Sequence, residues 1–483
     1  MLILRKNKLK KRIKAVAVFD LALVLMLTQT GCGRLSKEPG NESEERLNAS
    51  VIAETIEESS EDSGEENSEK SGDETDAAAL EEETNIAPQL DREGYRTDII
   101  LGDERTDIYI PLLTGKNVAV FSNNTGIVGD DTDKNIHIVD GLIESGISVS
   151  LIFSPEHGFR GNADAGESVS DGIDEKTGVT IVSLYGGSSS ALSADNMSKF
   201  DTLVVDIQDV GLRFYTYYIT MCKLMDACAQ YEKEVIILDR PNPNGFYVDG
   251  PILKDGFKSG VGSLPITTVH GMTLGELALM INGEGWLPEE RTCALTVVPC
   301  ENYSHKDFYR LVNNPSPNLR SMRAIYLYSS LCYFENTVVS VGRGTDNTFE
   351  IYGSPEFENA DGYDFVFTPE SNEGAKNPQY MGRECFGRDL SSLSLHTIRT
   401  EGINLDYLID CYTKYKEINP DGSFFGKPDA NGHYWIDLLF GTDEVRKMIE
   451  EGRYAREIEE SWTAEIKEFK SRRSEYLLYE DAD

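Results

Sequence analysis

Short runs of apolar residues recur in the middle of the chain, and they predict the buried strands of a sheet. The runs are NVAVFS, VSLIFS, VTIVSL, TLVVDI and EVIILD, at residues 117–122, 149–154, 179–184, 202–207 and 234–239. Helical patterns such as NIHIVDGLIESG and YITMCKLMDACAQYEK lie between several of them. Because strands alternate with helices, we expect an α/β fold whose mostly parallel sheet is covered on both faces.

Polar residues follow three of these strands. The second strand ends in SPEHGFRG, the fourth in DIQDVGLRFYTY and the fifth in LDRPNPNG. In open parallel sheets, ligands bind in the crevice beyond the carboxyl ends of the strands. The candidate residues for a ligand site at this edge are Glu156, His157, Arg160, Asp206, Gln208, Asp209, Arg213, Tyr215, Asp239 and Arg240.

A structural role is an alternative for several of these residues. Asp206 and Asp239 stand at the ends of apolar runs, where they could cap turns or pair with Arg213 and Arg240. Glu156 differs, because the proline before it and the glycine two positions after it favour a shaped loop.

The chain lacks several motifs of known cofactor-binding and catalytic sites, and this narrows the classes of reaction that we expect it to catalyse. It has no GxGxxG or GxxxxGK[ST] phosphate cradle, no GxSxG elbow and no HExxH pair. We therefore expect no nucleotide cofactor, no serine nucleophile and no catalytic metal. Carboxylates, arginines and tyrosines remain, and they suit glycoside hydrolysis, in which two groups flank the scissile bond. The arginines could bind an anionic substituent.

The amino terminus predicts export. A basic stretch, RKNKLKKRIK, precedes an apolar segment that ends at Gly31-Cys32, as in a lipoprotein signal peptide, with an uncleaved anchor helix as the alternative. Residues 41–83 hold 17 acidic and 2 basic side chains, so we expect a disordered tether. The remainder of the chain is then extracytoplasmic, held at the membrane through lipidated Cys32.

The folded part is acidic. From Asp91 onward it has 35 basic and 64 acidic residues, a net charge of −29. This charge argues against nucleic acid or an anionic lipid surface as a partner. Seven cysteines follow Cys32 without zinc-like spacing, and Cys293 with Cys300 is the one pair that we would test for a disulfide.

Several long motifs together resemble a known family. SPEHGFRGNADAGE, SLYG, DIQDVGLRFYTY, LDRPNPNG, VHGMTLGELA, NPSPN, GRGT and a terminal YLLY are similar to the NamZ-type exo-β-N-acetylmuramidases, over residues 117–479. The resemblance implies an enzyme that removes N-acetylmuramic acid from the non-reducing end of peptidoglycan fragments. It also implies a Rossmann-like domain, a smaller α/β or α+β domain and a cleft between them. The expected segments are a signal peptide (1–32), a tether (33–90), the catalytic domain (91–300) and the smaller domain (301–483).

The resemblance also assigns roles. The glutamate of the family's PEHG motif is Glu156 here, which makes it the expected catalytic residue. The second catalytic group stays open among several side chains and the sugar's own acetamido group, with Asp206 favoured. The side-chain candidates are Asp206, Glu167, Asp209, Tyr185 and Tyr215.

The expected substrate carries a carboxylate on its lactyl ether, so a selective site needs a cation. The candidate cations are Arg160, Arg213, Arg240 and Arg343, each of which could instead neutralise a nearby acid. His157, Gln208, Asp239 and Asn242 complete the expected substrate contacts. Asn313, Asn314 and Thr348 depart from the family pattern on the second domain's side.

Two other classes of protein remain possible from the sequence. A non-catalytic muropeptide-binding lipoprotein would keep the arginines and aromatic residues but would not need Glu156. A hydrolase of another bond, such as an amidase, would require a metal site that the motifs do not supply.

Overall fold

The computed structural model describes most of the chain after the acidic segment, and within that segment it describes the strand 49–51, which departs from the predicted disordered tether. The described residues are 49–51, 88–129, 135–155, 159, 171–184 and 191–482. They belong to one compact unit, Asn48–Asp483. None of the helices in these ranges is long and apolar enough to cross a membrane.

The larger of two sheets contains all five predicted strands. Its strands are β1 (Ala49–Val51), β2 (Asn117–Ser122), β3 (Ser148–Ser154), β4 (Gly172–Ile173), β5 (Thr180–Ser183), β6 (Thr202–Asp206), β7 (Glu234–Leu238) and β8 (Ala294–Val298). Within the described ranges their order is β1-β8-β7-β6-β2-β3-β5-β4, and only the β4–β5 pair is antiparallel. The prediction of a mostly parallel α/β sheet is confirmed.

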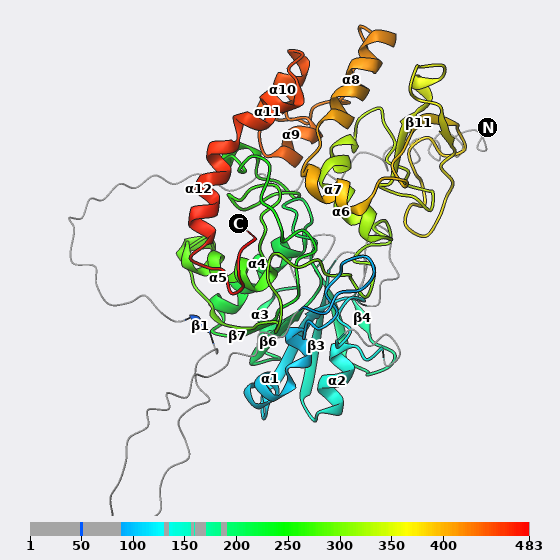
Figure 1. Cartoon of the computed structure of the whole chain (residues 1–483). Coiled ribbons are helices and arrows are strands. Elements are labelled where there is room, and N and C mark those ends of the chain that lie inside the picture. The colour runs from blue at the N-terminus through cyan, green and yellow to red at the C-terminus, as the bar shows by residue number, and fades with distance from the viewer. Residues whose placement is uncertain are drawn as a thin grey trace, which may run out of the picture. The chain divides into compact units, whose positions relative to one another are not determined.

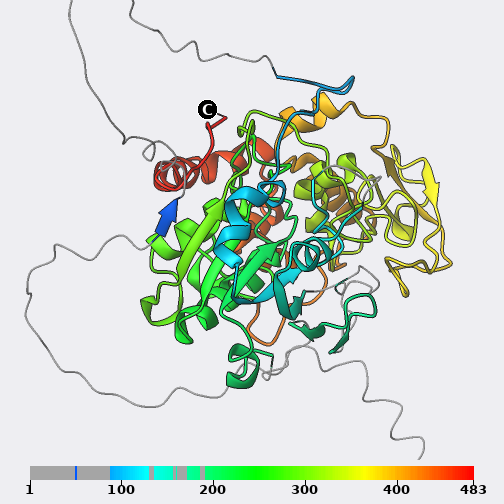
Figure 2. The ribbon, with the colours of Figure 1, turned by 90° about the horizontal axis from the view of Figure 1, so that it is seen from below.

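Helices cover both faces of this sheet (Figures 1 and 2). Side chains alternate along β2, so that Val118 and Val120 join the apolar cluster of α1 (Thr106–Leu113) and α2 (Ile138–Glu144). Ala119 and Phe121 belong instead to the cluster of α4 (Tyr217–Gln230) and α5 (Leu274–Gly283). A short helix, α3 (Ala194–Met197), precedes β6. Burial on both faces explains why the strands read as continuous apolar runs.

The strand order changes direction between β2 and β6. From β2 the chain proceeds through β3 to β5 on one side, and it then returns to place β6, β7 and β8 on the other. Loops at the carboxyl ends of β2 and β6 therefore diverge, which leaves the crevice in which α/β proteins bind ligands. The fold thus points to the ends of β2, β3 and β6.

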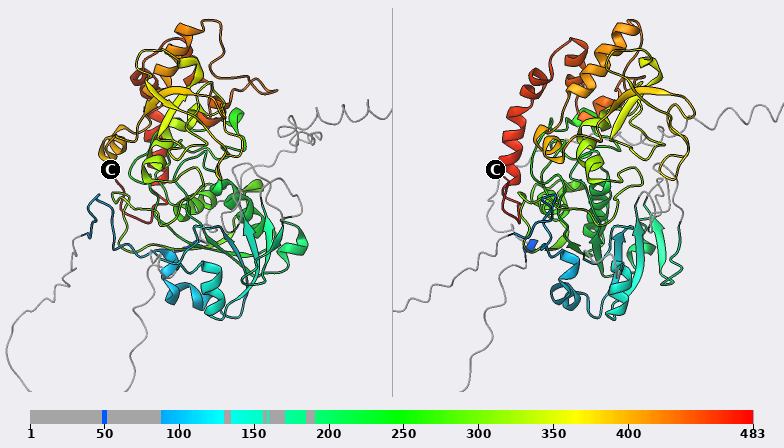
Figure 3. Two further views of the ribbon diagram at one scale, coloured as in Figure 1. Left: turned by 90° about the vertical axis from the view of Figure 1, so that its right-hand side faces the viewer. Right: turned by 45° about the vertical axis from the view of Figure 1, so that its right-hand side comes forward.

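The remainder of the chain forms a smaller region of mixed structure (Figure 3). A second sheet has the antiparallel order β10-β11-β9, from Phe365–Phe367, Cys385–Asp389 and Ile351–Ser354. The α-helices here are α6 (Met322–Leu331), α7 (Leu395–Glu401), α8 (Asp406–Ile418), α9 (Trp435–Phe440), α10 (Glu444–Glu450), α11 (Ala455–Ser461) and α12 (Thr463–Arg473). Single 3-10 turns occur along the whole fold at Gly102–Glu104, Asp255–Phe257, Pro288–Glu290, Cys332–Phe334 and Pro355–Phe357. The expected smaller α/β or α+β region is confirmed.

The end of the chain returns to the large sheet. The Tyr479 hydroxyl donates to Asp239 Oδ2 (2.7 Å) and accepts from the Cys300 backbone N–H (2.9 Å). Leu478 N–H donates to Glu276 Oε1 (2.8 Å). One apolar cluster also runs from α4 and α5 into α6 to α12. The two regions therefore share a core, and the terminal YLLY motif helps to join them.

The suggested disulfide between Cys293 and Cys300 is wrong. The two residues flank β8 at opposite ends, and all cysteines in the described ranges are free. Seven residues of extended chain span roughly 20 Å, whereas the Cα atoms of a disulfide lie within about 7 Å. Both side chains are buried, as small apolar residues commonly are.

Candidate active site

Five of the predicted site residues lie outside the described ranges. They are Glu156, His157, Arg160, Glu167 and Tyr185. Their predicted roles stay predictions.

The residues that flank Glu156 on either side are nevertheless placed. Pro155 follows β3 and is buried, and so is Phe159. The Phe159 ring packs edge-to-face on His137, with 4.7 Å between centroids. Two buried residues thus lie on either side of Glu156 in the chain, one at the end of β3 and one against α2.

A buried charge network joins the ends of β6 and β7. Arg240 Nε donates to Asp206 Oδ1 and Arg240 Nη2 donates to Asp103 Oδ2, both at 2.6 Å. Both carboxylates are 0% exposed and Arg240 is 6% exposed. The alternative that Asp206 pairs with Arg240 is confirmed, and the guanidinium has no exposed face for a substrate.

Burial and the neighbouring charges act against each other in this network. Burial raises the pKa of Asp103, and the nearby Asp206 adds to the rise, whereas Arg240 opposes it. Burial alone would lower the pKa of Arg240, but the two carboxylates raise it by more. Arg240 thus stays charged and keeps the two acids together.

One carboxylate oxygen of Asp206 accepts no hydrogen bond from the described residues. Its Oδ2 is buried and has no hydrogen-bond partner among the described residues. The loop after β2 lies beside it: a Cβ atom on Gly126 would come within 3.2 Å of Oδ2 and 2.1 Å of Ser122 Oγ. Only glycine fits there, so the loop passes close to the carboxylate. The role of Asp206 as the second catalytic group stays a prediction.

Gln208 ties the loops after β2, β6 and β7 together. Its backbone N–H donates to Thr125 Oγ1 (3.0 Å), and its Nε2 donates to the carbonyl oxygens of Asp209 (2.8 Å) and Pro241 (2.9 Å). The side chain is 4% exposed. These contacts position the loops. The observed role of Gln208 therefore differs from the predicted contact with substrate.

Asp209 is a buried carboxyl with an incomplete set of partners. Its Oδ1 accepts from the Gly211 backbone N–H (2.7 Å), while Oδ2 has no partner among the described residues. Burial raises the pKa of Asp209 to about 7, although two backbone N–H groups lower it. The folded protein therefore binds a proton here at a pH where the unfolded chain has released it.

This raised pKa predicts a pH dependence of stability. A carboxyl whose folded pKa exceeds its unfolded value makes folding less favourable as pH rises between the two values, here from about 4 to about 7. Asp209→Asn should remove this contribution. Relative to wild type, its free energy of unfolding should rise by about 2 kcal/mol between pH 5 and pH 6.5. Urea unfolding of both proteins across this range measures it, and parallel pH curves would contradict it.

Asp239 and Asn242 hold the start of α5. Asp239 Oδ2 accepts from Thr273 Oγ1 (2.6 Å) and Oδ1 accepts from the Gly275 backbone N–H (2.9 Å). Asn242 Nδ2 donates to the Met272 carbonyl oxygen (2.9 Å). Burial raises the pKa of Asp239 to about 6. Because both side chains are buried and engaged, the structural alternative describes them better than substrate contact.

Arg213 is a structural residue in this fold. It is 0% exposed, and its guanidinium donates to the carbonyl oxygens of Pro251, Ile266, Leu439 and Phe440 at 2.6–3.0 Å. The last two acceptors belong to α9, so the side chain joins the two regions. The prediction of a substrate contact is corrected, since every direction around the guanidinium is occupied by protein.

The substitution Arg213→Lys distinguishes a structural role of this residue from a role in substrate binding. Arg213→Lys keeps the charge but cannot reach all the carbonyl groups, so the free energy of unfolding should fall by about 2 kcal/mol. The Michaelis constant of the folded fraction should not change. Urea unfolding and steady-state kinetics check the two values, and a raised Michaelis constant with unchanged stability would restore the substrate role.

Tyr215 connects the sheet to the NPSPN motif. Its hydroxyl donates to the Pro315 carbonyl oxygen (2.6 Å), as does that of Tyr217 (2.9 Å). Asn313 Nδ2 donates to the Asn124 carbonyl oxygen, and Asn124 Nδ2 donates back to Asn314, both at 3.1 Å. The two asparagines that depart from the family pattern thus bind the loop after β2.

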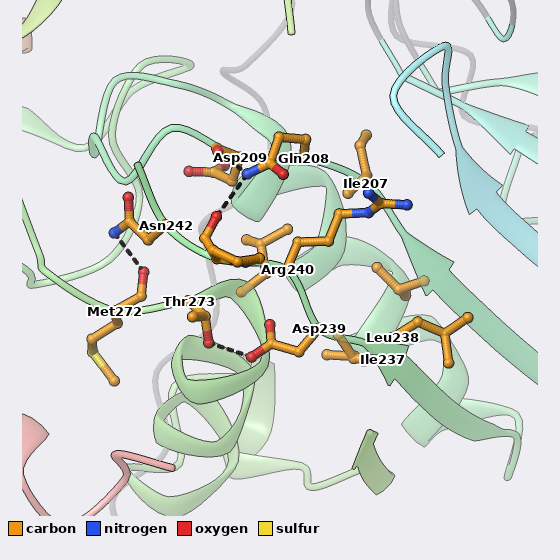
Figure 4. A pocket seen from close by; sticks show the side chains of 13 residues that line it. Ile207, Gln208, Asp209, Ile237, Leu238, Asp239, Arg240, Asn242, Met272 and Thr273 are labelled. Atoms are coloured by element: carbon orange, nitrogen blue, oxygen red, sulfur yellow. Dashed lines mark hydrogen bonds between the residues drawn. The ribbon is translucent and has the colours of Figure 1, made fainter. Parts of the chain in front are cut away.

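Two cavities lie at this edge of the large sheet, and they differ in size. The cavity among Gln208, Asp209, Asp239 and Arg240 has about 10 Å³, room for one water molecule (Figure 4). A cavity of about 390 Å³ lies beside the switch point, lined by Asn124, Ile127, Asn135, His137, Asp140, Lys176 and Asn313. Only the larger cavity is in the size range of ligand sites.

His137 lines this larger cavity and contacts Phe159, the residue after the PEHG motif. Its Nε2 lies 2.7 Å from the Asn123 carbonyl oxygen, while Nδ1 accepts from the Val139 backbone N–H (3.2 Å). A carbonyl oxygen can only accept, so Nε2 carries the proton. The same ring packs on Phe159. Phe159 therefore lies against a residue that borders the cavity.

Sequence reasoning missed four residues of this site: Asp103, Asn123, Thr125 and His137. Two of them, Asn123 and Thr125, follow from one omission, because the polar run NNTG after β2 also marks a strand end at the same edge. Asp103 gave no signal, since it lies in a turn before the first predicted strand. No group of three or more potential metal ligands occurs among the described residues.

Comparisons with known proteins cover both regions. The profile described as exo-beta-N-acetylmuramidase NamZ, N-terminal, matches residues 118–323, and its C-terminal counterpart matches 326–479. The chain is 33% identical over 394 residues to peptidoglycan beta-N-acetylmuramidase NamZ of Bacillus subtilis (strain 168), covering 77% of this chain and 89% of that protein.

Two solved structures share the fold. A DUF1343 family protein from Bacteroides fragilis NCTC 9343 is 54% identical with a TM-score of 0.71, and a second from the same organism is 25% identical with a TM-score of 0.66. Each comparison covers 80% of this chain and 100% of the other. The chain therefore belongs to the NamZ family of exo-β-N-acetylmuramidases.

Proposed function

We propose that this protein is an exo-acting glycoside hydrolase that releases N-acetylmuramic acid from the non-reducing end of peptidoglycan fragments. The observation that carries the proposal is similarity along both halves of the NamZ family, including a relative named as a peptidoglycan β-N-acetylmuramidase. The two matched ranges include the PEHG motif and the GRGT motif, respectively.

The geometry at the switch point supports this chemistry. Glycoside hydrolysis needs an acid that protonates the leaving oxygen and a second group on the sugar. Glu156 is the second residue after β3 in the chain, and β3 pairs with β2, whose following loop borders the 390 Å³ cavity. We assign Glu156 as the acid and keep Asp206 as the favoured second group.

The location of the protein is part of the proposal. The signal peptide, lipidated Cys32 and the acidic tether would hold the enzyme outside the cytoplasm, where peptidoglycan lies. The basic and apolar segments before Cys32 support this location. Metabolic labelling with an alkynyl fatty acid tests the anchor, and absence of label from the membrane-bound protein would remove Cys32 from the proposal.

The activity is tested with the full chain in detergent. A disaccharide with a non-reducing β-N-acetylmuramyl residue should yield free N-acetylmuramic acid, and a chromogenic β-N-acetylmuramide should release its aglycone. A disaccharide capped at that end by N-acetylglucosamine serves as the control. Binding of muropeptides without any sugar release would favour a non-catalytic lipoprotein instead.

A further inference from the structure

A second cavity is lined, among the described residues, by the smaller region. It has about 550 Å³ and is lined by Glu335, Ser340, Arg343, Lys376, Gln379 and Trp435, among others. Its walls combine segments before β9, between β10 and β11, and at the start of α9. This volume is in the range of cavities that hold a sugar-sized ligand.

Arg343 is held on the wall of this cavity by the shape of the GRGT turn. Gly342 and Gly344 on either side of it have positive φ angles of +76° and +84°. A Cβ on Gly342 would come within 2.6 Å of Ile351, and one on Gly344 within 2.5 Å of the Glu370 carbonyl oxygen. Both positions require glycine. The turn therefore presents Arg343 in a fixed direction.

The guanidinium of Arg343 is only partly engaged. Its Nη2 donates to Glu335 Oε1 (2.5 Å), and its central carbon lies 5.3 Å from the centroid of the Phe349 ring. It has no other hydrogen-bond partner among the described residues, and its side chain is 29% exposed. A guanidinium has five N–H donors. Donors thus remain for a ligand in the cavity.

Among the candidate cations with described positions, Arg343 alone lines a cavity of sugar size. Arg213 is enclosed by backbone carbonyl groups, and Arg240 is enclosed by two carboxylates. The folded part carries a net charge of −29, so an anionic ligand needs such a local cation.

A second donor borders the same cavity. The indole Nε1–H of Trp435 is buried and has no hydrogen-bond partner among the described residues. Buried polar groups in native proteins are normally satisfied, so this donor fits a site that a ligand oxygen completes.

We infer that Arg343 binds the lactyl carboxylate of N-acetylmuramic acid in the 550 Å³ cavity and thereby selects this sugar over N-acetylglucosamine. The inference rests on the proposed function for the identity of the sugar. Bidentate pairing between guanidinium and carboxylate supplies both the attraction and the orientation. Glu335 beside Arg343 lowers the affinity for the anion, because its own charge repels the ligand.

The binding test uses three sugars with the full chain. N-acetylmuramic acid, its lactyl carboxamide and N-acetylglucosamine are titrated calorimetrically into wild type, Arg343→Met and Glu335→Gln. Arg343→Met should weaken binding of the acid by roughly tenfold to a hundredfold and leave that of the carboxamide unchanged. Glu335→Gln should strengthen binding of the acid severalfold. A merely structural pair would weaken all ligands in both variants.

Control variants show whether a change in binding comes from loss of the fold. Arg343→Met leaves Glu335 unpaired, so the double variant Glu335→Gln/Arg343→Met removes both charges, and its melting temperature should match wild type. Arg388→Met is the matched arginine control, since Arg388 pairs with Asp410 (2.8 Å) outside the cavity. If the double variant folds and still prefers the acid over the carboxamide as wild type does, the inference is wrong.

Failure of the activity and failure of this inference are distinguishable. Titration needs no turnover, so a wild-type protein that binds the acid preferentially but releases no sugar would contradict the proposed function alone. If the wild-type protein hydrolyses the muramide and the Arg343→Met variant keeps the wild-type specificity, the inference alone is contradicted.

Discussion

Glu156→Gln should lower the rate constant for release of N-acetylmuramic acid by about two to four powers of ten, the usual contribution of general acid catalysis. Glutamine has nearly the same shape as glutamate but cannot give a proton to the leaving oxygen. In the chain, Glu156 stands between Pro155 and Phe159, which are both buried. The prediction is that a general acid at this position has a raised pKa, as protonation of a leaving group requires.

Single-turnover and steady-state rates on a chromogenic β-N-acetylmuramide measure the loss. Glu175→Gln is the matched control, because Glu175 is exposed on the turn between β4 and β5. Its rate should equal that of wild type. Calorimetric titration with N-acetylmuramic acid shows whether the Glu156 variant still binds sugar. Turnover of Glu156→Gln within about tenfold of wild type would assign the acid to another residue.

Arg240→Met should lower the free energy of unfolding by about 3–5 kcal/mol, because it leaves two buried carboxylates without their partner. Asp103 and Asp206 are both 0% exposed and each lies 2.6 Å from the guanidinium. Without Arg240 each carboxylate would also face the other's charge. The loss should be larger than for any single exposed ion pair.

Urea unfolding at several pH values tests this prediction. In Arg240→Met the Asp103 carboxyl group, whose pKa Arg240 lowers in the wild type, should take up a proton more readily, so the deficit should shrink as pH falls from 7 to 5. Arg456→Met is the control, since Arg456 is 88% exposed in its pair with Glu460 and should change stability by less than about 0.5 kcal/mol. A deficit below about 1 kcal/mol for Arg240→Met would show that the network contributes little.

The sequence by itself determined the elements and the edge of the sheet that carries the site. Each predicted strand is an apolar run bounded by polar residues. Because these strands are buried on both faces, such runs can be recognised in the sequence before the fold is known. The cap of α5 was equally local, because Thr273 and Glu276 exchange hydrogen bonds within one turn. Strands and helix caps of this kind depend on residues that are close in the chain, so the amino-acid sequence is enough to predict them.

Only the tertiary structure decided which polar residues are free to meet a ligand. Arg213 and Arg343 were both candidate cations from their motifs, yet one is enclosed by carbonyl groups and the other lines a cavity. Asp103 meets Arg240 from 137 positions away. The place of β6 beside β2, which creates the switch point, is likewise absent from any local pattern. The physical reason is that the burial and partners of a charged side chain are set by segments distant in the chain, which the types of its sequence neighbours do not specify.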